Sequence, residues 1–197
     1  MRMILAAVMG AMMALPAYAN PISLEEISRY FNSFTTAQGE FTQINGDGSI
    51  STGTIYIARP GRIRFEYAPP DSSLVMAGGS QVAIFDPKSN QPPEQYPLSR
   101  TPLNLILAQN VDLTRARMVV AHVSDGETTT VVAQDPDRPQ HGSIEMVFTA
   151  NPTELRQWII RDDAGGATTV VLNDLATNMQ LSSFLFNIHY EEEQRRR

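Results

Sequence analysis

The sequence predicts a mainly β (α+β) protein: an antiparallel sheet of about eleven strands with a few helices resting on it. After residue 19 the chain is rich in threonine, valine, isoleucine and short polar turns, which is the composition of strands. From residue 39 onward, apolar and polar residues alternate with a period of two. Turn signals such as Asp125-Gly126 and Gly165-Gly166 separate the apolar runs at the regular spacing of an antiparallel sheet.

Residues 1–19 have the layout of a secretory signal peptide. One positive charge, Arg2, precedes a dozen mostly apolar residues, then Pro16 and the small-x-small sequence Ala17-Tyr18-Ala19. The apolar stretch is shorter than the ~20 residues that span a bilayer. The alternatives are an uncleaved anchor or a buried helix. Because residue 20 is Asn and the chain has no cysteine, we expect no lipid anchor on an N-terminal cysteine and a soluble protein outside the cytoplasm.

The first helix is predicted over residues 22–34. One apolar stripe runs along it at the spacing i, i+3, i+4 and i+7: Ile27, Tyr30, Phe31 and Phe34. Ser23 and Glu26 have the spacing of a capping box, in which each side chain satisfies a free backbone N–H of the first turn.

Strands and turns follow in order. The sequence Asn45-Gly46-Asp47-Gly48 predicts a turn between strands at 39–44 and 49–58. Arg59-Pro60-Gly61-Arg62 predicts a type II turn with a positive φ at the glycine, leading into a strand at 62–67. Further strands are predicted at 74–76, 81–85, 95–98, 117–123, 128–134, 143–149, 155–161, 168–173 and 181–188.

A short apolar helix interrupts this run. Thr101 is its predicted N-cap and Pro102 its first helical residue. Leu103, Ile106 and Leu107 share one face.

Length and charge limit the functional classes. Removal of residues 1–19 leaves 178 residues, which we expect to form a single domain over 20–197. The formal net charge moves from −6 to −7, so nucleic acid is not an expected partner. The basic run at 195–197 follows three glutamates, and we interpret it as a solvated tail. With no cysteine, stability depends on packing alone.

No catalytic or metal-binding pattern is apparent. His122, His141 and His189 lack the spacing of metal ligands, and no cysteine joins them. The sequence has no Gly-x-Ser-x-Gly nucleophile elbow, and no spacing singles out a catalytic pair among the 21 acidic residues. We therefore expect neither an enzyme nor a cofactor, although catalytic residues can also come together from distant positions.

Several predicted strands carry bulky apolar residues on both faces, namely 55–57, 74–76, 82–85, 158–160 and 184–186. A sheet covered on one face would alternate strictly. Strands of this kind suit a sheet curled around a hydrophobic interior, with another segment against part of its outer face. The pattern alone favours the simpler alternative, an ordinary sandwich core.

Five stretches, in consistent order over nearly the whole mature chain, match one known family. They are Phe41-Thr42-Gln43, the run from Gly53 to Tyr67, Phe85-Asp86-Pro87, the run from Thr101 to Leu107, and Phe184-Leu185-Phe186-Asn187. With these stretches the chain resembles LolA, the periplasmic carrier of outer-membrane lipoproteins. The Gly-x-x-x-x-x-Arg-Pro-Gly-x-x-Arg-Phe core within the second run is the most specific of them.

The resemblance implies an incomplete antiparallel β-barrel of about eleven strands with a helical lid over a hydrophobic cavity. It implies a monomeric carrier that accepts triacylated lipoproteins from an inner-membrane ABC transporter and passes them to an outer-membrane receptor. Arg59 matches the family's arginine that bonds to backbone carbonyls of the lid and holds the empty carrier closed. The family's cavity-lining positions match Ile55, Ile63, Phe65, Val75, Leu103 and Ile106. The plainer alternatives are a solvated turn residue for Arg59 and ordinary core packing for the other six.

The chain departs from the family pattern at two places. Gly78-Gly79 stands where the family usually has Asp-Gly, and Ile188-His189-Tyr190-Glu191 replaces the usual Pro-x-Gly after the final Phe-x-Phe. A periplasmic carrier of another amphiphile, such as a glycolipid, is therefore the alternative function. A lipoprotein sensor would need a further domain, for which 178 residues leave no room, and a lipid hydrolase would need the catalytic residues that the search did not find.

Overall fold

The computed structural model describes residues 20–195 apart from 90, 116 and 163. The predicted signal peptide and its cleavage site lie outside these residues. Three α-helices are described: α1 (Leu24–Asn32), α2 (Leu103–Ile106) and α3 (Ile188–Arg195). The strands are β1 (Thr36–Ile44), β2 (Ile50–Ala58), β3 (Arg62–Tyr67), β4 (Leu74–Gly78), β5 (Gln81–Phe85), β6 (Glu94–Pro97), β7 (Val119–Ser124), β8 (Thr128–Gln134), β9 (Ser143–Thr149), β10 (Glu154–Arg161), β11 (Ala167–Leu172) and β12 (Ala176–Thr177).

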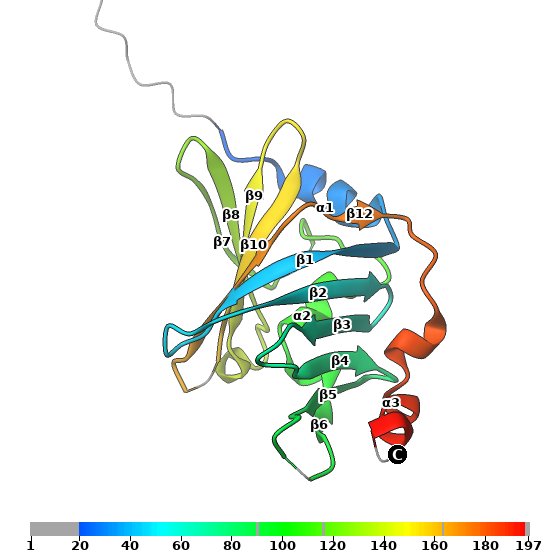
Figure 1. Cartoon of the computed structure of the whole chain (residues 1–197). Coiled ribbons are helices and arrows are strands. Elements are labelled where there is room, and N and C mark those ends of the chain that lie inside the picture. The colour runs from blue at the N-terminus through cyan, green and yellow to red at the C-terminus, as the bar shows by residue number, and fades with distance from the viewer. Residues whose placement is uncertain (1–19, 90, 116, 163, 196–197) are drawn as a thin grey trace, which may run out of the picture.

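All twelve strands belong to one antiparallel sheet. Its order is β6-β5-β4-β3-β2-β1-β11-β10-β9-β8-β7, and the short β12 pairs with β1. The edge strands β6 and β7 have one partner each in the described part of the chain, so the sheet curls but does not close. Figure 1 shows this open, strongly twisted wall. The predicted fold class is confirmed, and the sandwich alternative is wrong.

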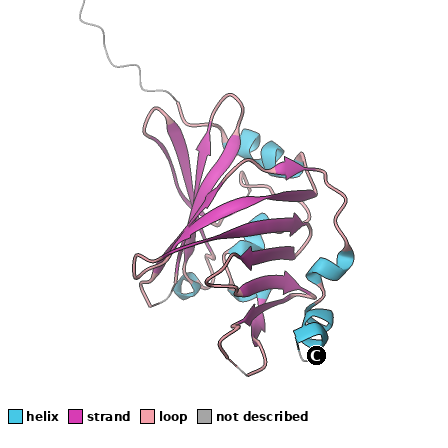
Figure 2. Ribbon diagram, viewed as in Figure 1, coloured by secondary structure: helices cyan, strands magenta, loops and turns pink. Residues whose placement is uncertain are grey.

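The interior core lies between the concave face of the sheet and the helices α1 and α2. Ile27 and Phe31 of α1, Ile106 of α2 and Trp158 of β10 all belong to one buried cluster. In Figure 2 the helices α1 and α2 sit beside and behind the curled strands. A single curved sheet thus buries its inner face against helices instead of a second sheet.

A second, smaller cluster lies on the outer face. It consists of Leu74 and Met76 of β4 and Ala83 and Phe85 of β5, with Ile188 of α3 packed against them. Neighbouring residues of β4 therefore point to opposite faces, and both faces are covered. This arrangement explains the apolar residues on both faces of 74–76 and 82–85.

The strand predicted at 181–188 is wrong. Ser183–Phe186 forms a 3₁₀ helix in which the Ser182 hydroxyl accepts from the Phe184 N–H at 3.3 Å, and α3 follows it. This segment lies across the outer face of β3 and β4 and not at an edge of the sheet. Because strands β3 and β4 already have partners on both sides, the segment satisfies its backbone groups locally.

The two departures from the family pattern meet at this segment. A Cβ on Gly78 would lie only 2.1 Å from the carbonyl oxygen of Phe186, and the Phe186 side chain is buried. Glycine at this position therefore allows the C-terminal segment to pack against the end of β4.

Two local predictions needed correction. The Ser23 hydroxyl caps α1 by accepting from the Glu26 N–H at 3.2 Å, as predicted, but the Glu26 carboxylate accepts from the Thr153 hydroxyl at 2.5 Å. Thr101 is not the cap of α2, because its hydroxyl donates to the Leu98 carbonyl at 2.9 Å and ends the preceding 3₁₀ helix. Pro102 is the N-cap instead.

Candidate functional site

The β2–β3 turn positions Arg59 beneath the helices. Gly61 has φ +70°, as predicted, although the Arg59–Pro60 bond is cis. The Arg59 N–H donates to the Thr35 carbonyl at 2.8 Å, and the Gly61 N–H donates to the Leu107 carbonyl at 2.8 Å. The turn is thus joined both to the chain after α1 and to the end of α2.

The guanidinium of Arg59 is buried, with only 6% of the residue exposed. Its Nη2 donates to the carbonyls of Phe31 and Phe34, and its Nη1 donates to the Ala108 carbonyl at 3.4 Å. The last carbonyls of a helix lack partners within the helix and carry partial negative charge, so a cation suits this position. Burial lowers the pKa of Arg59. Arg59 is therefore not a solvated turn residue.

α1 is also joined to the chain that follows α2. The Asn32 side chain, at the end of α1, donates to the Val111 carbonyl at 2.8 Å and accepts from the Val111 N–H at 3.0 Å. One turn earlier, the Ser28 hydroxyl accepts from the Leu113 N–H at 3.0 Å. We call α1, α2 and residues 107–113 the lid. These bonds tie its two parts together, and Arg59 ties both parts to the sheet.

The six predicted cavity residues all belong to the interior. Ile55, Ile63, Phe65 and Ile106 are buried in the main cluster, and Val75 and Leu103 are half-buried against it. The residues around Ile106 and Arg59 leave a gap of only about 10 Å³. A void of that size holds roughly one water molecule at most, so the interior is closed and filled by its own side chains.

The gap has a wider lining than the sequence indicated. Its lining residues are Tyr30, Phe31, Phe34, Ile57, Arg59, Ile106, Leu107, Leu155, Trp158 and Leu175. Of the predicted site residues, only Arg59 and Ile106 belong to this set. The residues from α1 were recognised as one apolar stripe, whereas Leu155 was assigned only to a strand, and Trp158 to a strand that is apolar on both faces.

A surface pocket of about 270 Å³ adjoins the gap. It shares Tyr30, Phe34, Leu155 and Leu175 with the gap. Its rim is polar and includes Arg156, which pairs with Glu154 at 2.5 Å and with Asp174 at 3.5 Å. The pocket and the gap together offer a polar mouth above an apolar interior.

Tyr30 lies where these two spaces meet. Burial raises the pKa of its hydroxyl, although a hydrogen bond with the backbone of Leu155 lowers it in part. Its ring meets the rings of Phe31, Phe34 and Phe148 edge to face, at centroid distances of 5.5, 5.6 and 6.1 Å. The hydroxyl stays protonated at neutral pH, so the mouth gains no charge from it.

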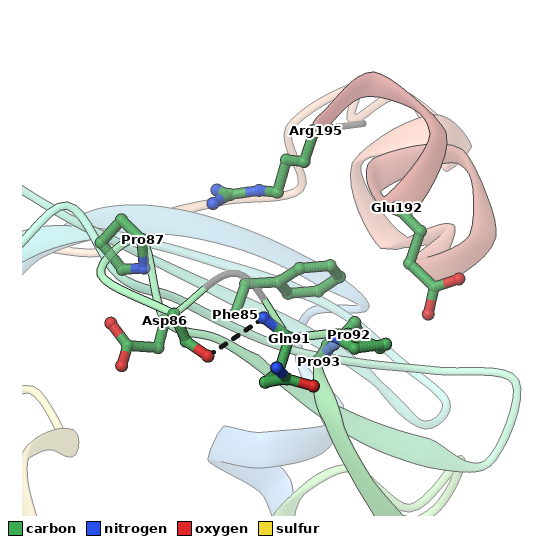
Figure 3. Close-up of a pocket in the computed structure, with 9 residues that line it drawn as sticks. Phe85, Asp86, Pro87, Gln91, Pro92, Pro93, Glu192 and Arg195 are labelled. Atoms are coloured by element: carbon green, nitrogen blue, oxygen red, sulfur yellow. Dashed lines mark hydrogen bonds between the residues drawn. The ribbon is translucent and has the colours of Figure 1, made fainter. Parts of the chain in front are cut away.

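A larger groove of about 670 Å³ lies on the outside, between α3 and the loop after β5 (Figure 3). Phe85, Pro87, Pro92 and Pro93 line it, and the Arg195 guanidinium lies 5.1 Å from the Phe85 ring centroid. In the loop after β5, the Ser89 N–H donates to the Asp86 carbonyl at 3.1 Å. The groove belongs to the outer cluster and is separate from the interior gap.

Of the basic run at 195–197 that we interpret as a solvated tail, only Arg195 lies within the described residues, where it is exposed and pairs with Glu191 of α3. The Glu191 carboxylate, with 15% of its side chain exposed, bonds to Arg64 at 3.1 Å and to Arg195 at 2.9 Å. Burial alone would raise the pKa of Glu191, but the hydrogen bond from Arg195 and the charge of Arg64 outweigh burial and lower it. Arg196 and Arg197 lie outside the described residues.

The described residues contain neither a membrane-spanning helix nor a metal-binding cluster. No helix among them is long and apolar enough to cross a membrane. No three His, Asp or Glu side chains among them are grouped to hold a metal ion.

A family model and curated relatives that match this chain carry the same description. The family model described as outer membrane lipoprotein carrier protein LolA matches residues 32–189. An outer-membrane lipoprotein carrier protein of Cupriavidus necator is 27% identical over 185 residues, covering 88% of this chain and 81% of that protein. An outer-membrane lipoprotein carrier protein of Chromohalobacter salexigens is 27% identical over 192 residues, covering 91% of this chain and 90% of that protein.

A solved structure shares the fold. It is a putative outer membrane lipoprotein-sorting protein domain from Vibrio parahaemolyticus, with a TM-score of 0.52 and 9% sequence identity. The match covers 84% of this chain and 95% of that one.

Proposed function

This chain belongs to the LolA family of outer membrane lipoprotein carrier proteins, and from that premise we propose that it is a periplasmic carrier of lipoproteins. The observation that carries the proposal is the apolar interior closed by a lid that one buried arginine ties to the sheet. Acyl chains of the cargo would replace the lid's own apolar side chains against the sheet. No covalent step is needed for this role.

The physical need for such a carrier follows from the cost of exposing acyl chains to water. Burial of one methylene is worth about 0.8 kcal/mol, so a sixteen-carbon chain represents ~12 kcal/mol. Free diffusion of a triacylated protein between two membranes is negligible at that cost. A carrier must therefore cover the chains and still release them.

A lid held by a few charge-assisted hydrogen bonds supplies this balance. In the empty protein, Arg59 bonds to three carbonyls of the chain around α1 and α2. Cargo must break these bonds, and reclosure of the lid regains them when the cargo leaves. Arg59 is thus the proposed latch, and Ile55, Ile63, Phe65, Val75, Leu103 and Ile106 are the proposed surface for the acyl chains.

We also propose how the protein reaches the periplasm and which partners give and receive its cargo. The protein is exported after cleavage behind Ala19, works as a single domain over 20–197, and is a monomer. It takes triacylated lipoproteins from an inner-membrane ABC transporter and gives them to an outer-membrane receptor of higher affinity. A glycolipid or another amphiphile is the alternative cargo, because an apolar interior selects chains more than head groups.

The test uses the protein that lacks residues 1–19. Native mass spectrometry would identify any lipid that co-purifies with it, and spheroplasts would show whether it releases a lipoprotein from the inner membrane. Release of the lipoprotein supports the proposal. No release, together with a different lipid bound in the purified protein, would overturn it in favour of the alternative cargo.

A further inference from the structure

The interior contains a hydrogen-bond donor with nothing to bond to. Trp158, in the middle of β10, is fully buried between Met146 of β9 and Val170 of β11. Among the residues that the structure describes, its Nε1 has no hydrogen-bond partner. A buried unsatisfied N–H destabilises the folded state, and a phenylalanine would fill a similar space without that cost.

The nearest aromatic contact does not remove this cost. The Phe65 ring meets the Trp158 ring at 88°, with centroids 6.2 Å apart. The face of an aromatic ring is at best a weak acceptor compared with a carbonyl oxygen. A water molecule is an equally poor partner for the Trp158 N–H, because the adjoining gap of about 10 Å³ holds at most one molecule and its lining is mainly apolar.

A second residue with an unpartnered donor, Arg59, lines the same gap. Arg59 uses Nη1 and Nη2 for the lid carbonyls, whereas its Nε has no hydrogen-bond partner among the described residues. Trp158 and Arg59, each with one unpartnered N–H among the described residues, thus both line an otherwise apolar gap. Such a site suits a ligand that is almost wholly apolar but carries acceptor oxygens.

The surface pocket beside the gap indicates which part of a ligand would carry these acceptor oxygens. The surface pocket with the polar rim of Glu154, Arg156 and Asp174 shares part of its wall with the gap. A lipid with its head group at this rim and its chains inside would have its ester linkages between the two regions. Ester carbonyls are strong acceptors, and they occur in the diacylglyceryl group of a lipoprotein and in a phospholipid alike.

We propose that Trp158 is a specificity-determining residue whose indole N–H donates to an ester carbonyl of a glycerol-linked acyl chain. The inference rests on the proposed function, because it names the part of the cargo that the interior recognises. The closed structure keeps the donor unsatisfied, and bound diacyl lipid satisfies it. An ether-linked lipid of the same length lacks the carbonyl and gains no such bond.

The test exploits the fact that Trp158 is the only tryptophan in the chain. Protein labelled with ¹⁵N, without residues 1–19, gives one indole N–H resonance. It would be titrated with a diacylglyceryl-cysteinyl peptide, a diacyl phospholipid, and the dialkyl ether counterpart of each. We expect both ester ligands to move the indole proton downfield and to slow its exchange, and both ethers to do neither.

Affinity gives the second measurement. Trp158→Phe should weaken the binding of each ester ligand about 3- to 10-fold, the net worth of one neutral hydrogen bond, and leave the ether affinities unchanged. Phe148→Leu is the matched control, because Phe148 is another fully buried ring of the same core and offers no donor. This control should affect esters and ethers alike.

The outcomes separate the two proposals. Equal indole shifts for esters and ethers, or an equal loss for both in Trp158→Phe, would overturn the role of Trp158 and leave the carrier proposal intact. If neither diacyl ligand binds the unmodified protein, the carrier proposal itself is wrong. A response to the phospholipid but not to the peptide supports recognition of the ester and assigns it to membrane lipid.

Discussion

Removal of the Arg59 side chain should separate acceptance of cargo from its delivery. In Arg59→Leu the apolar interior remains, but the bonds to the carbonyls of Phe31, Phe34 and Ala108 are lost. The closed, empty form then becomes less favourable relative to the open form. We expect the variant to accept lipoprotein normally and to pass it on poorly.

The magnitude follows from the contacts. A hydrogen bond from a charged donor is worth about 1.5–3 kcal/mol, and the cost of burying the guanidinium offsets part of the sum of three such bonds. A net loss of about 2–3 kcal/mol shifts the closed-to-open ratio by roughly 30- to 150-fold. Because cargo binds only the open form, its apparent affinity rises by the same factor. Transfer to a receptor becomes less favourable to the same degree.

Two assays measure the two steps. Release of a lipoprotein from spheroplasts measures acceptance, and transfer of the loaded complex to outer-membrane vesicles measures delivery. Arg62→Leu is the matched control: Arg62 is three residues along the same turn, its Nε donates to the Ala58 carbonyl at 3.0 Å, and its guanidinium lies 5.7 Å from the Phe186 ring centroid. Both contacts are with residues outside the lid. Normal delivery by Arg59→Leu would refute the latch.

Three further outcomes are expected. Gly78→Ala should lower the free energy of unfolding by about 1–3 kcal/mol through overpacking, whereas Gly46→Ala, whose Cβ would meet only ordinary contacts, should leave denaturant unfolding almost unchanged. Because the pKa of Glu191 is lowered in the folded state, its stabilising contribution is present above pH 4.5 and lost as pH falls through the lowered value. Glu191→Gln should therefore reduce the melting temperature at pH 7, and a difference that persists unchanged at pH 3 would contradict the ion pair with Arg64. Asn32→Ala should speed amide exchange in residues 107–113 by unlinking the lid, and unchanged exchange there would show that packing alone joins its parts.

Much of the fold could be predicted because its signals are local. Alternation of apolar and polar residues over six residues was enough to predict β3, and the stripe on α1 was enough to predict a helix with one buried face. The signals failed at residues 181–188, where Phe184 and Phe186 flank Leu185 as in a strand. Only Phe186 is buried, whereas Phe184 is 60% exposed, and whether a segment joins a sheet depends on a free neighbour that no local pattern reveals.

The site was predictable only in part. Arg59 was found through its match to the family motif, whereas the backbone carbonyls that accept its hydrogen bonds and make it a tether lie 25 to 49 positions away in the chain. Trp158 was one of three adjacent apolar residues on a strand, and the sequence contained no sign that its N–H would lack a partner. That property depends on every atom around the ring.

By itself, the sequence determined that this protein is a mainly β chain with a leader-like N-terminus, a helix with one apolar face, and strands apolar on both faces. Periodicity determines these features because each depends on residues close together in the chain. Only the tertiary structure decided that the sheet curls without closing, that α3 and Phe186 cover its outer face, and that the lid closes the interior to about 10 Å³. Those features depend on contacts between residues that are distant in the chain. At Gly78, for example, the Phe186 carbonyl comes so close that only a residue without a Cβ allows the C-terminal segment to pack there.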